Sequence, residues 1–177
     1  IERVTALGRR FLSLTADLRL IDGIPQLLER AVAEFGHIDI LVNNVGGIVG
    51  RKWLGEIDRQ FWQTVLDVNM TTMLNVTQAA LPWLKSATDG ASIINLASLA
   101  GRSGGHAGSL AYFTTKGAIL TWTRSLAAEL GEHGVRVNAV APGLILGTRF
   151  HNRHTTQASA DETIRQIPLK RAGTPDD

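Results

Sequence analysis

Short apolar runs alternate with long amphipathic segments along this chain, and this alternation restricts its fold more than any other feature. The runs have the length and residue content of buried strands, and they lie at 11–15, 38–42, 92–97 and 135–141. The segments between them carry apolar residues at helical spacing, and they lie at 25–35, 57–83 and 112–130, with a short helix at 160–167. Alternating strands and helices predict βαβ units and a mostly parallel sheet, so we expect an α/β fold.

The composition excludes several classes of function. The apolar fraction of 44% and the charged fraction of 19% are those of a soluble globular protein. The length predicts one domain over residues 1–177. A net charge of +2, with scattered basic residues, does not favour a nucleic-acid or anionic-membrane partner, and the absence of cysteine excludes disulfides and thiolate metal sites. No apolar run approaches the roughly 20 residues of a membrane span and no signal peptide opens the chain, so we expect a cytoplasmic protein without a membrane partner.

Polar and turn-forming residues follow the predicted strands at their carboxyl ends. They are Asp17, Asn43, Ser98 and the pair Pro142-Gly143. Parallel strands bring their carboxyl ends to one edge of the sheet, and ligands of open α/β sheets bind beyond this edge. The sequence therefore predicts that one cleft collects these residues.

Tyr112 and Lys116 lie four positions apart on the predicted helix 112–130, and Tyr112 is the only tyrosine in the chain. This spacing puts the phenol and the ammonium on one helix face. A cation beside a phenol favours the phenolate and lowers its pKa from about 10, which makes a general acid/base that works near neutral pH. The alternative is a chance pair on a solvated helix, and the surrounding residues decide between the two.

Six short motifs, in this order, resemble the short-chain dehydrogenase/reductase family. They are Asp17-Leu18, Asn43-Asn44-Val45-Gly46, Asn69, Ser98, Tyr112-x-x-x-Lys116 and Pro142-Gly143. The resemblance covers essentially the whole chain. It implies a Rossmann-like, doubly wound parallel sheet and an NAD(P)-dependent oxidoreductase that interconverts a secondary alcohol and a ketone by hydride transfer.

The resemblance also implies catalytic roles for four residues. Tyr112 would protonate the substrate oxygen during reduction and deprotonate the hydroxyl during oxidation. Lys116 would hold the pKa of Tyr112 down and hydrogen-bond the nicotinamide ribose, so that this pair would also contact the cofactor. Ser98 would orient the reacting oxygen. Asn69 would disturb the hydrogen bonding of helix 57–83 and position a water for proton relay to Lys116; without the resemblance, it would be interpreted as a polar residue on a solvated helix face.

Further cofactor contacts are implied near the first strand ends. Asn43, Val45 and Gly46 would pass close to the adenosine, where small residues let the backbone approach a ligand. Val45 stands where the family usually has alanine. Asp17 would hydrogen-bond the adenine, with Leu18 beside it. The alternatives are an ordinary Asn/Gly turn for the first group and a capping or turn role for Asp17.

The remaining implied cofactor contacts follow the last predicted strand. Pro142 and Gly143 would shape the loop under the nicotinamide, and the Ile145 backbone would face its carboxamide. The family often has threonine five residues after the proline, where this chain has Gly147, so we carry that role to Thr148. The resemblance implies NAD or NADP as the cofactor. The choice between the two is not readable, because the residues that would make it follow a second strand that this sequence does not include.

Four other residues leave alternatives open. His106 and Leu110 lie in or after the Gly-rich loop that borders the substrate in the family, and they would line its pocket or belong to a plain solvent loop. His151 and His154 have a spacing that a metal could use on a helix. They have no nearby acidic or cysteine partner, so we expect no metal.

Parts of the family pattern are missing from this sequence. The Gly-x-x-x-Gly-x-Gly turn, which would bind the pyrophosphate at a helix N-terminus, does not occur in it. Ile1 aligns just before the family's third strand, so the first two strands of the family are absent from this sequence. The family's C-terminal strand is absent from it as well. We therefore expect one incomplete Rossmann-like domain that belongs to a longer native chain of roughly 250 residues.

The substrate is readable only as a class. The opening through Asn44 resembles dehydrogenases of 2-deoxy-gluconate and 2-keto-3-deoxy-gluconate, and the remainder resembles 3-oxoacyl-carrier-protein reductases and glucose/ribitol-type dehydrogenases. The stretch Asp89-Gly90-Ala91 lacks the arginine that often docks the acyl carrier, which argues mildly against a carrier partner. Arginines at 149, 153 and 165 would meet an acidic substrate or simply be solvated.

Two classes of function remain. The first is an oxidoreductase acting on a small-molecule alcohol or ketone, which the full set of catalytic residues favours. The second is a non-catalytic cofactor-binding or scaffold relative of the same fold. By resemblance we expect a homodimer or homotetramer, with helices 57–83 and 112–130 at the interface.

Overall fold

The computed structural model describes residues 2–177 and contains a parallel sheet. Its strands are β1 (Ile40–Asn43), β2 (Ala91–Leu96) and β3 (Val135–Val140), in the order β1-β2-β3. The register places Val42 opposite Ile94, and Ile94 opposite Asn138. The predicted α/β fold with a parallel sheet is confirmed.

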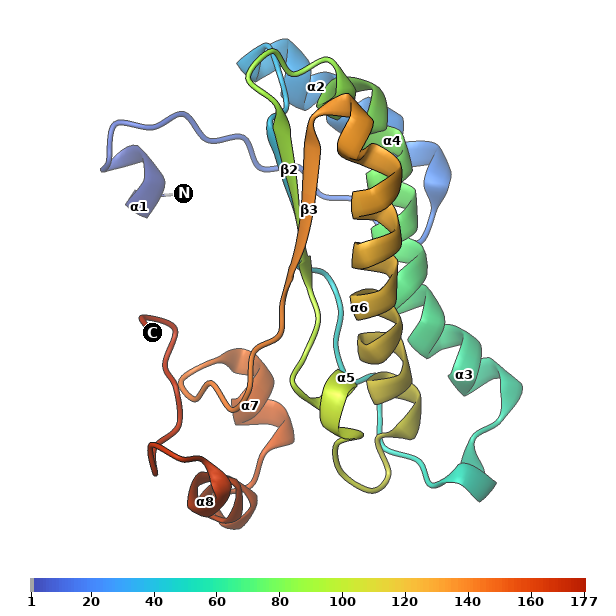
Figure 1. Ribbon diagram of the computed structural model, residues 1–177, viewed down its shortest axis with the longest axis vertical. Helices are drawn as coiled ribbons and strands as arrows, with labels where there is room; N and C mark the ends of the chain where they lie inside the picture. The colour runs from blue at the N-terminus through green and yellow to red at the C-terminus, as the bar shows by residue number, and fades with distance from the viewer. Residues whose placement is uncertain (1) are drawn as a thin grey trace.

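The long helices α4 (Thr72–Lys85) and α6 (Leu110–Leu130) pack on one face of this sheet. The other helical segments are α1 (Glu2–Thr5), η1 (Ile21–Gly23), α2 (Ile24–Phe35), η2 (Leu54–Glu56), α3 (Arg59–Leu66), η3 (Asp67–Thr71), α5 (Ala100–Ser103), η4 (Gly131–His133), α7 (Arg149–His154) and α8 (Gln157–Gln166). Figure 1 shows α4 and α6 along the same side of the strands, with α7 and α8 below the carboxyl end of β3. Consecutive strand order with right-handed crossovers requires this one-sided arrangement.

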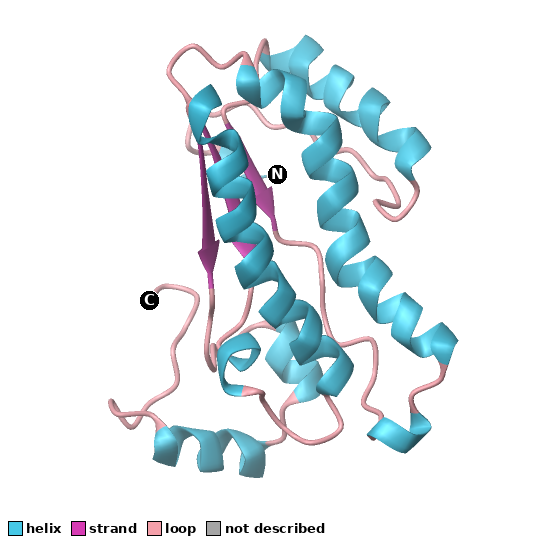
Figure 2. Cartoon of the chain, turned by 45° about the vertical axis from the view of Figure 1, so that its right-hand side comes forward, coloured by secondary structure: helices cyan, strands magenta, loops and turns pink. Residues whose placement is uncertain are grey.

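The main core lies between the sheet and its covering helices. Ile93 of β2 is fully buried against Leu84 of α4 and Leu130 of α6, and Ile24 of α2 closes the same cluster. A second, smaller cluster of Met73, Ala97 and Ile119 lies nearer the carboxyl ends of the strands. The two clusters hold α4 and α6 against the strands whose ends carry the predicted site residues. Figure 2 shows the long helices in front of the strands.

The predicted strand at 11–15 is wrong. These residues form an irregular segment, and Phe11 is 45% exposed. A strand must pair its backbone groups with a neighbour, and no described residue pairs with this segment. The outer edge of β1 also has no partner among residues 2–177, and its side chains Ile40 and Val42 are more than half exposed.

Candidate active site

Tyr112 and Lys116 lie buried in the first turns of α6, beside the end of β2. Tyr112 is 7% exposed and Lys116 is 5% exposed. The Nζ of Lys116 lies 5.7 Å from the centroid of the Tyr112 ring and donates a hydrogen bond of 2.6 Å to the carbonyl oxygen of Leu96, the last residue of β2. Ser98 follows two residues later, and its Oγ accepts from the backbone N of Ala100 at 3.2 Å. The helix and the strand end thus bring these predicted residues to one edge of the sheet.

The ionisation of this pair differs from the expectation. Burial raises the pKa of Tyr112 to about 12, whereas the sequence predicted a lowered value. Burial also lowers the pKa of Lys116 to about 8, because desolvation disfavours the charged ammonium. The lowering of the Tyr112 pKa that we expected from Lys116 is outweighed by burial. The Lys116 ammonium donates to the Leu96 carbonyl and lies near the face of the Tyr112 ring, and it forms no hydrogen bond with the phenol oxygen.

Asn69 lies in a π-helical turn and is almost completely buried. Its predicted disturbance of the long helix is confirmed, because η3 interrupts the α-helical bonding between α3 and α4. The Asn69 Nδ2 donates to the carbonyl oxygens of Val65 at 3.0 Å and Gly47 at 3.1 Å, and its Oδ1 accepts from the Gly47 N at 2.9 Å. Asn69 therefore fastens the loop after β1 to the helix, and its part in a water relay stays a prediction.

Gly46 fits its position only because it lacks a side chain. Its φ is +155°, and a Cβ there would lie 2.8 Å from the Oδ1 of Asn69 and 3.5 Å from the Nζ of Lys116. A larger residue would push into the Asn69 amide. The loop backbone can thus approach Lys116 closely, which is the geometry that a predicted cofactor-contacting loop needs.

A small cavity of about 50 Å³ joins three predicted cofactor residues. Leu18, Asn43 and Val45 line it, together with Asn44 and residues of α4. The buried Asn75 of α4, which the sequence did not single out, holds this segment by donating from Nδ2 to the Leu18 carbonyl oxygen at 3.1 Å.

The predicted adenine ligand Asp17 is not among the residues that line this cavity. Its carboxylate is exposed and accepts three hydrogen bonds from the Arg19 side chain, and these bonds lower the Asp17 pKa to about 2. The turn alternative for Asp17 is thus realised here, since its Oδ1 also accepts from the Arg19 backbone N at 3.0 Å.

Asn43 has a structural environment that sequence reasoning missed. Its Nδ2 donates to Oγ1 of Thr77 at 3.0 Å and to Oδ1 of Asn95 at 2.9 Å, and Nδ2 of Asn95 donates to Oγ1 of Thr123 at 3.0 Å. This buried network ties β1 and β2 to α4 and α6. The signal in the sequence is Asn95 itself, a polar residue within an apolar strand.

The loop after β3 is held in place by backbone hydrogen bonds. The carbonyl oxygen of Pro142 accepts from the Leu99 N at 3.0 Å, so this loop lies against the segment after Ser98. Ile145 forms a parallel bridge with Gly173. The hydroxyl of Thr148 donates to the Ile145 carbonyl oxygen at 3.2 Å and caps α7 by accepting from the His151 N. The proposed cofactor contacts of Pro142, Gly143, Ile145 and Thr148 stay predictions.

Two aromatic rings pack on Tyr112, and neither contact was predicted from the sequence. The Phe113 ring centroid lies 5.5 Å from that of Tyr112, and the Phe150 centroid, from α7, lies 6.2 Å away. His151 and His154 pack edge-on or tilted against Phe150, and Nδ1 of His151 hydrogen-bonds Thr155. Helix α7 therefore covers the catalytic tyrosine candidate with an apolar ring.

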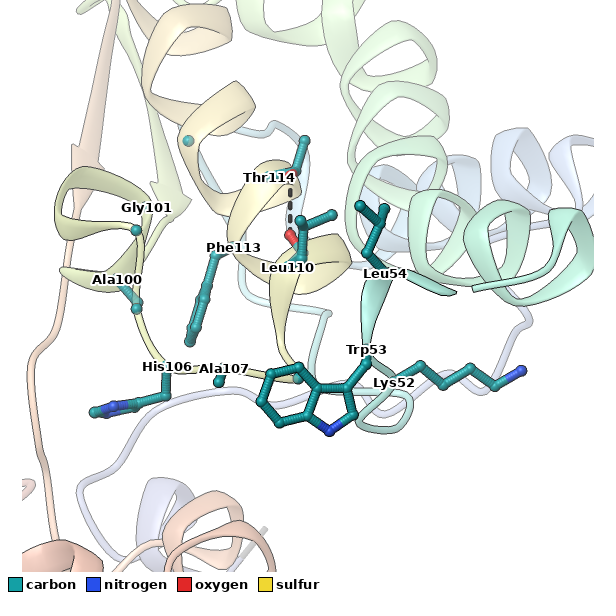
Figure 3. A pocket seen from close by; sticks show the side chains of 14 residues that line it. Lys52, Trp53, Leu54, Ala100, Gly101, His106, Ala107, Leu110, Phe113 and Thr114 are labelled. Atoms are coloured by element: carbon teal, nitrogen blue, oxygen red, sulfur yellow. Dashed lines mark hydrogen bonds between the residues drawn. The ribbon is translucent and has the colours of Figure 1, made fainter. Parts of the chain in front are cut away.

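A second and larger cavity lies on a neighbouring face of α6. It measures about 530 Å³ and is lined by the Gly-rich loop after α5, by Trp53 and Leu54, and by α6 (Figure 3). His106 and Leu110, predicted as candidate pocket residues, both line it. Phe113 and Thr114 also line it, whereas Tyr112 and Lys116 do not. This cavity is thus separate from the Tyr112 site.

Two kinds of feature are absent from the described residues, a cluster of metal ligands and a membrane-spanning helix. No group of three or more His, Cys, Asp or Glu residues in the described part of the chain could hold a metal ion. None of its helices combines the length and the apolar character that a bilayer crossing requires.

Several known proteins are similar to this chain over most of its length. A family model described as enoyl-(acyl carrier protein) reductase matches residues 1–177. The chain is 44% identical over 177 residues to the 2-dehydro-3-deoxy-D-gluconate 5-dehydrogenase of Escherichia coli (strain K12), covering 100% of this chain and 69% of that protein. The chain belongs to the short-chain dehydrogenase/reductase family. The family prediction is confirmed.

Two other members show the range of the family around this chain. It is 34% identical over 173 residues to the 3-oxoacyl-[acyl-carrier-protein] reductase FabG of Staphylococcus epidermidis (strain ATCC 35984), covering 98% of this chain and 69% of that one. It also resembles the crystal structure of the NADH-dependent reductase A1-R′ complexed with NAD, with 31% identity and a TM-score of 0.71, over 75% of this chain. The match covers 57% of that reductase. The chain thus belongs to a family of nicotinamide-dependent oxidoreductases with a Rossmann-like fold.

Proposed function

We propose that this chain carries the proton-transfer site and part of the cofactor site of an NAD(P)-dependent oxidoreductase for secondary alcohols and ketones. The observation that carries the proposal is the buried Tyr112–Lys116 pair beside the end of β2. Strand β2 ends at Leu96, and Ser98 follows two residues later. The hydroxyl of Tyr112 forms no hydrogen bond within residues 2–177, so it is available to a substrate oxygen.

In this proposal the chain's own residues bind, orient and protonate the substrate. Ser98 holds the reacting oxygen, and the Tyr112 hydroxyl donates its proton to that oxygen in reduction or receives one in oxidation. Lys116, anchored on Leu96, supplies the positive charge that the developing phenolate requires. Phe150 covers the ring and excludes water from it.

A nicotinamide cofactor fits the residues present. Gly46 leaves open the space that a Cβ would fill beside Asn69 and Lys116, and the cavity lined by Leu18, Asn43 and Val45 lies beyond the carboxyl end of β1. When bound, the cofactor supplies or accepts the hydride. Asn43, Val45 and Gly46 would hold its adenosine side, and Lys116, Gly143 and Thr148 its nicotinamide side.

We propose a sugar acid as the substrate. Support comes from the dehydrogenase of 2-dehydro-3-deoxy-D-gluconate, which at 44% identity is more similar to this chain than the 3-oxoacyl reductase at 34%. A second support is the absence of an arginine in the stretch before β2, where a carrier-docking arginine often stands.

The proposal is tested with a panel of keto sugar acids, polyols and 3-oxoacyl thioesters, each assayed with NADH and NADPH and in the reverse direction. We expect turnover of a keto or hydroxy sugar acid at least about tenfold more efficient than of the thioesters, a difference of roughly 1.4 kcal/mol in transition-state binding. Cofactor binding without turnover of any compound would instead favour a non-catalytic relative.

Self-association of the chain is a further part of this proposal. Five exposed positions of α6 carry small side chains at helical spacing, namely Thr114, Ala118, Thr121, Ser125 and Ala128, and the charged Arg124 and Glu129 flank them. Small residues let two helices approach closely, so this face suits a helix of a second copy. Sedimentation velocity at several concentrations measures whether a dimer or tetramer forms.

A further inference from the structure

Arg51 connects three segments that surround Tyr112. It comes from the loop after β1, and its Nη1 donates to Oγ of Ser109, the buried residue that precedes α6. Its Nη2 donates to the backbone carbonyl oxygen of His154 at the end of α7, at 3.2 Å. Ser109 precedes Tyr112 by three residues, which is about 4.5 Å along a helix axis. The guanidinium is therefore bonded to the residue that opens the helix of the proposed proton donor.

The charge of Arg51 is not compensated. Arg10, Arg19, Arg165 and Arg171 each pair with a carboxylate, whereas Arg51 forms no ion pair with any residue in the range 2–177. Both of its acceptors are neutral oxygens. A guanidinium has five N–H donors, so three remain free for another group.

The surroundings of Arg51 add positive charge rather than negative charge. His154 and its neighbour Arg153 lie near Arg51. Burial lowers the His154 pKa most, and the positive charges of Arg153 and Arg51 lower it further. Arg153 has no ion pair within the described residues either. The space between α7 and the start of α6 therefore favours an anion.

We propose that Arg51 is the residue that binds the substrate carboxylate and so selects sugar acids over neutral sugars. This inference rests on the proposed function. A carboxylate accepts two parallel hydrogen bonds from a guanidinium fork. Arg51 binds Ser109, three residues before Tyr112, and the last residue of α7. Phe150 of α7 packs on the Tyr112 ring, so both partners of the fork adjoin the proposed proton donor. Ser109 and the His154 carbonyl hold the fork in place, which reduces the entropy that binding costs.

The test compares a keto sugar acid with its neutral carboxamide in the wild-type protein and in Arg51→Gln. We expect Arg51→Gln to raise KM for the acid about 10- to 100-fold, with a smaller change in kcat, because a charged hydrogen-bonded pair is lost. KM for the carboxamide should change less than about twofold. Arg51→Lys, which keeps the charge but not the fork, should recover part of the loss.

Arg10→Gln is the matched control, since it removes an exposed arginine charge from the segment before α2, where Arg10 already pairs with Glu34. This variant should leave KM and kcat unchanged for both the acid and the carboxamide. An equal loss for acid and carboxamide would overturn the proposal and make Arg51 a support of α7 only, and an increase in KM for the cofactor alone would assign the site to a cofactor phosphate. If the wild type turns over neither compound, the proposed function fails, and the dissociation constants of acid and carboxamide, measured by calorimetry, still decide whether Arg51 prefers the acid.

Discussion

Tyr112→Phe is expected to lower kcat by about 100- to 10,000-fold, because the substrate oxygen loses its positioned proton donor. Substrate KM should change little, since the ring stays packed between Phe113 and Phe150. The Tyr112 hydroxyl has no partner within the described residues, so its removal should shift the free energy of unfolding by less than about 1 kcal/mol. Steady-state kinetics and urea unfolding measure the two quantities.

Thr114→Ala is the control for this variant. Thr114 lies two residues along the same helix, and its hydroxyl donates to the Leu110 carbonyl oxygen and borders the separate large cavity. Its loss should leave kcat unchanged within about twofold. A Tyr112→Phe protein that is folded and turns over like the wild type would remove Tyr112 from the mechanism.

Lys116→Met is expected to lower kcat by about 100- to 1,000-fold, because the cation that stabilises the phenolate disappears. Methionine has a similar length and tolerates an apolar site, so the helix should keep its packing. The same variant also tests the buried charge through the pH dependence of stability.

The direction of that pH dependence follows from the Lys116 pKa. Burial lowers it to about 8 in the folded state, against 10.5 in an unperturbed lysine. Between these values the unfolded chain binds the proton and the folded chain does not, so stability rises with pH. From about pH 7.5 to about pH 9.5, wild type should gain roughly 2 kcal/mol relative to Lys116→Met. Urea unfolding of both proteins at several pH values measures this difference, and parallel curves would show that Lys116 is charged and solvated in the folded state.

Features that depend on local spacing could be predicted from the sequence. The four-residue separation of Tyr112 and Lys116 needs only a helix, and the parallel order of the strands follows from their alternation with helices. The irregular turn at Asn69 was expected from the family resemblance, and the structure gives its reason, since the Asn69 amide binds Val65 and Gly47.

Features that depend on long-range packing could not be predicted. Residues 11–15 have the composition of a strand, but a strand also needs a partner, and composition does not reveal one. Phe150 packs on Tyr112 and Arg51 binds Ser109 from segments distant in the chain, and no sequence spacing predicts either contact. The pKa of Tyr112 was predicted in the wrong direction because burial, which the sequence does not specify, exceeds the influence of Lys116.

In our proposal, Tyr112 is a buried phenol whose ionisation belongs to the reaction. Ultraviolet titration of tyrosinate measures its pKa, and subtraction of the Tyr112→Phe spectrum isolates this one side chain. We expect a pKa of about 12 in the protein alone, and a value below the ordinary 10 once saturating oxidised cofactor adds its positive charge beside Lys116. A pKa that stays near 12 in the cofactor complex would contradict the assignment of Tyr112 as the general acid/base.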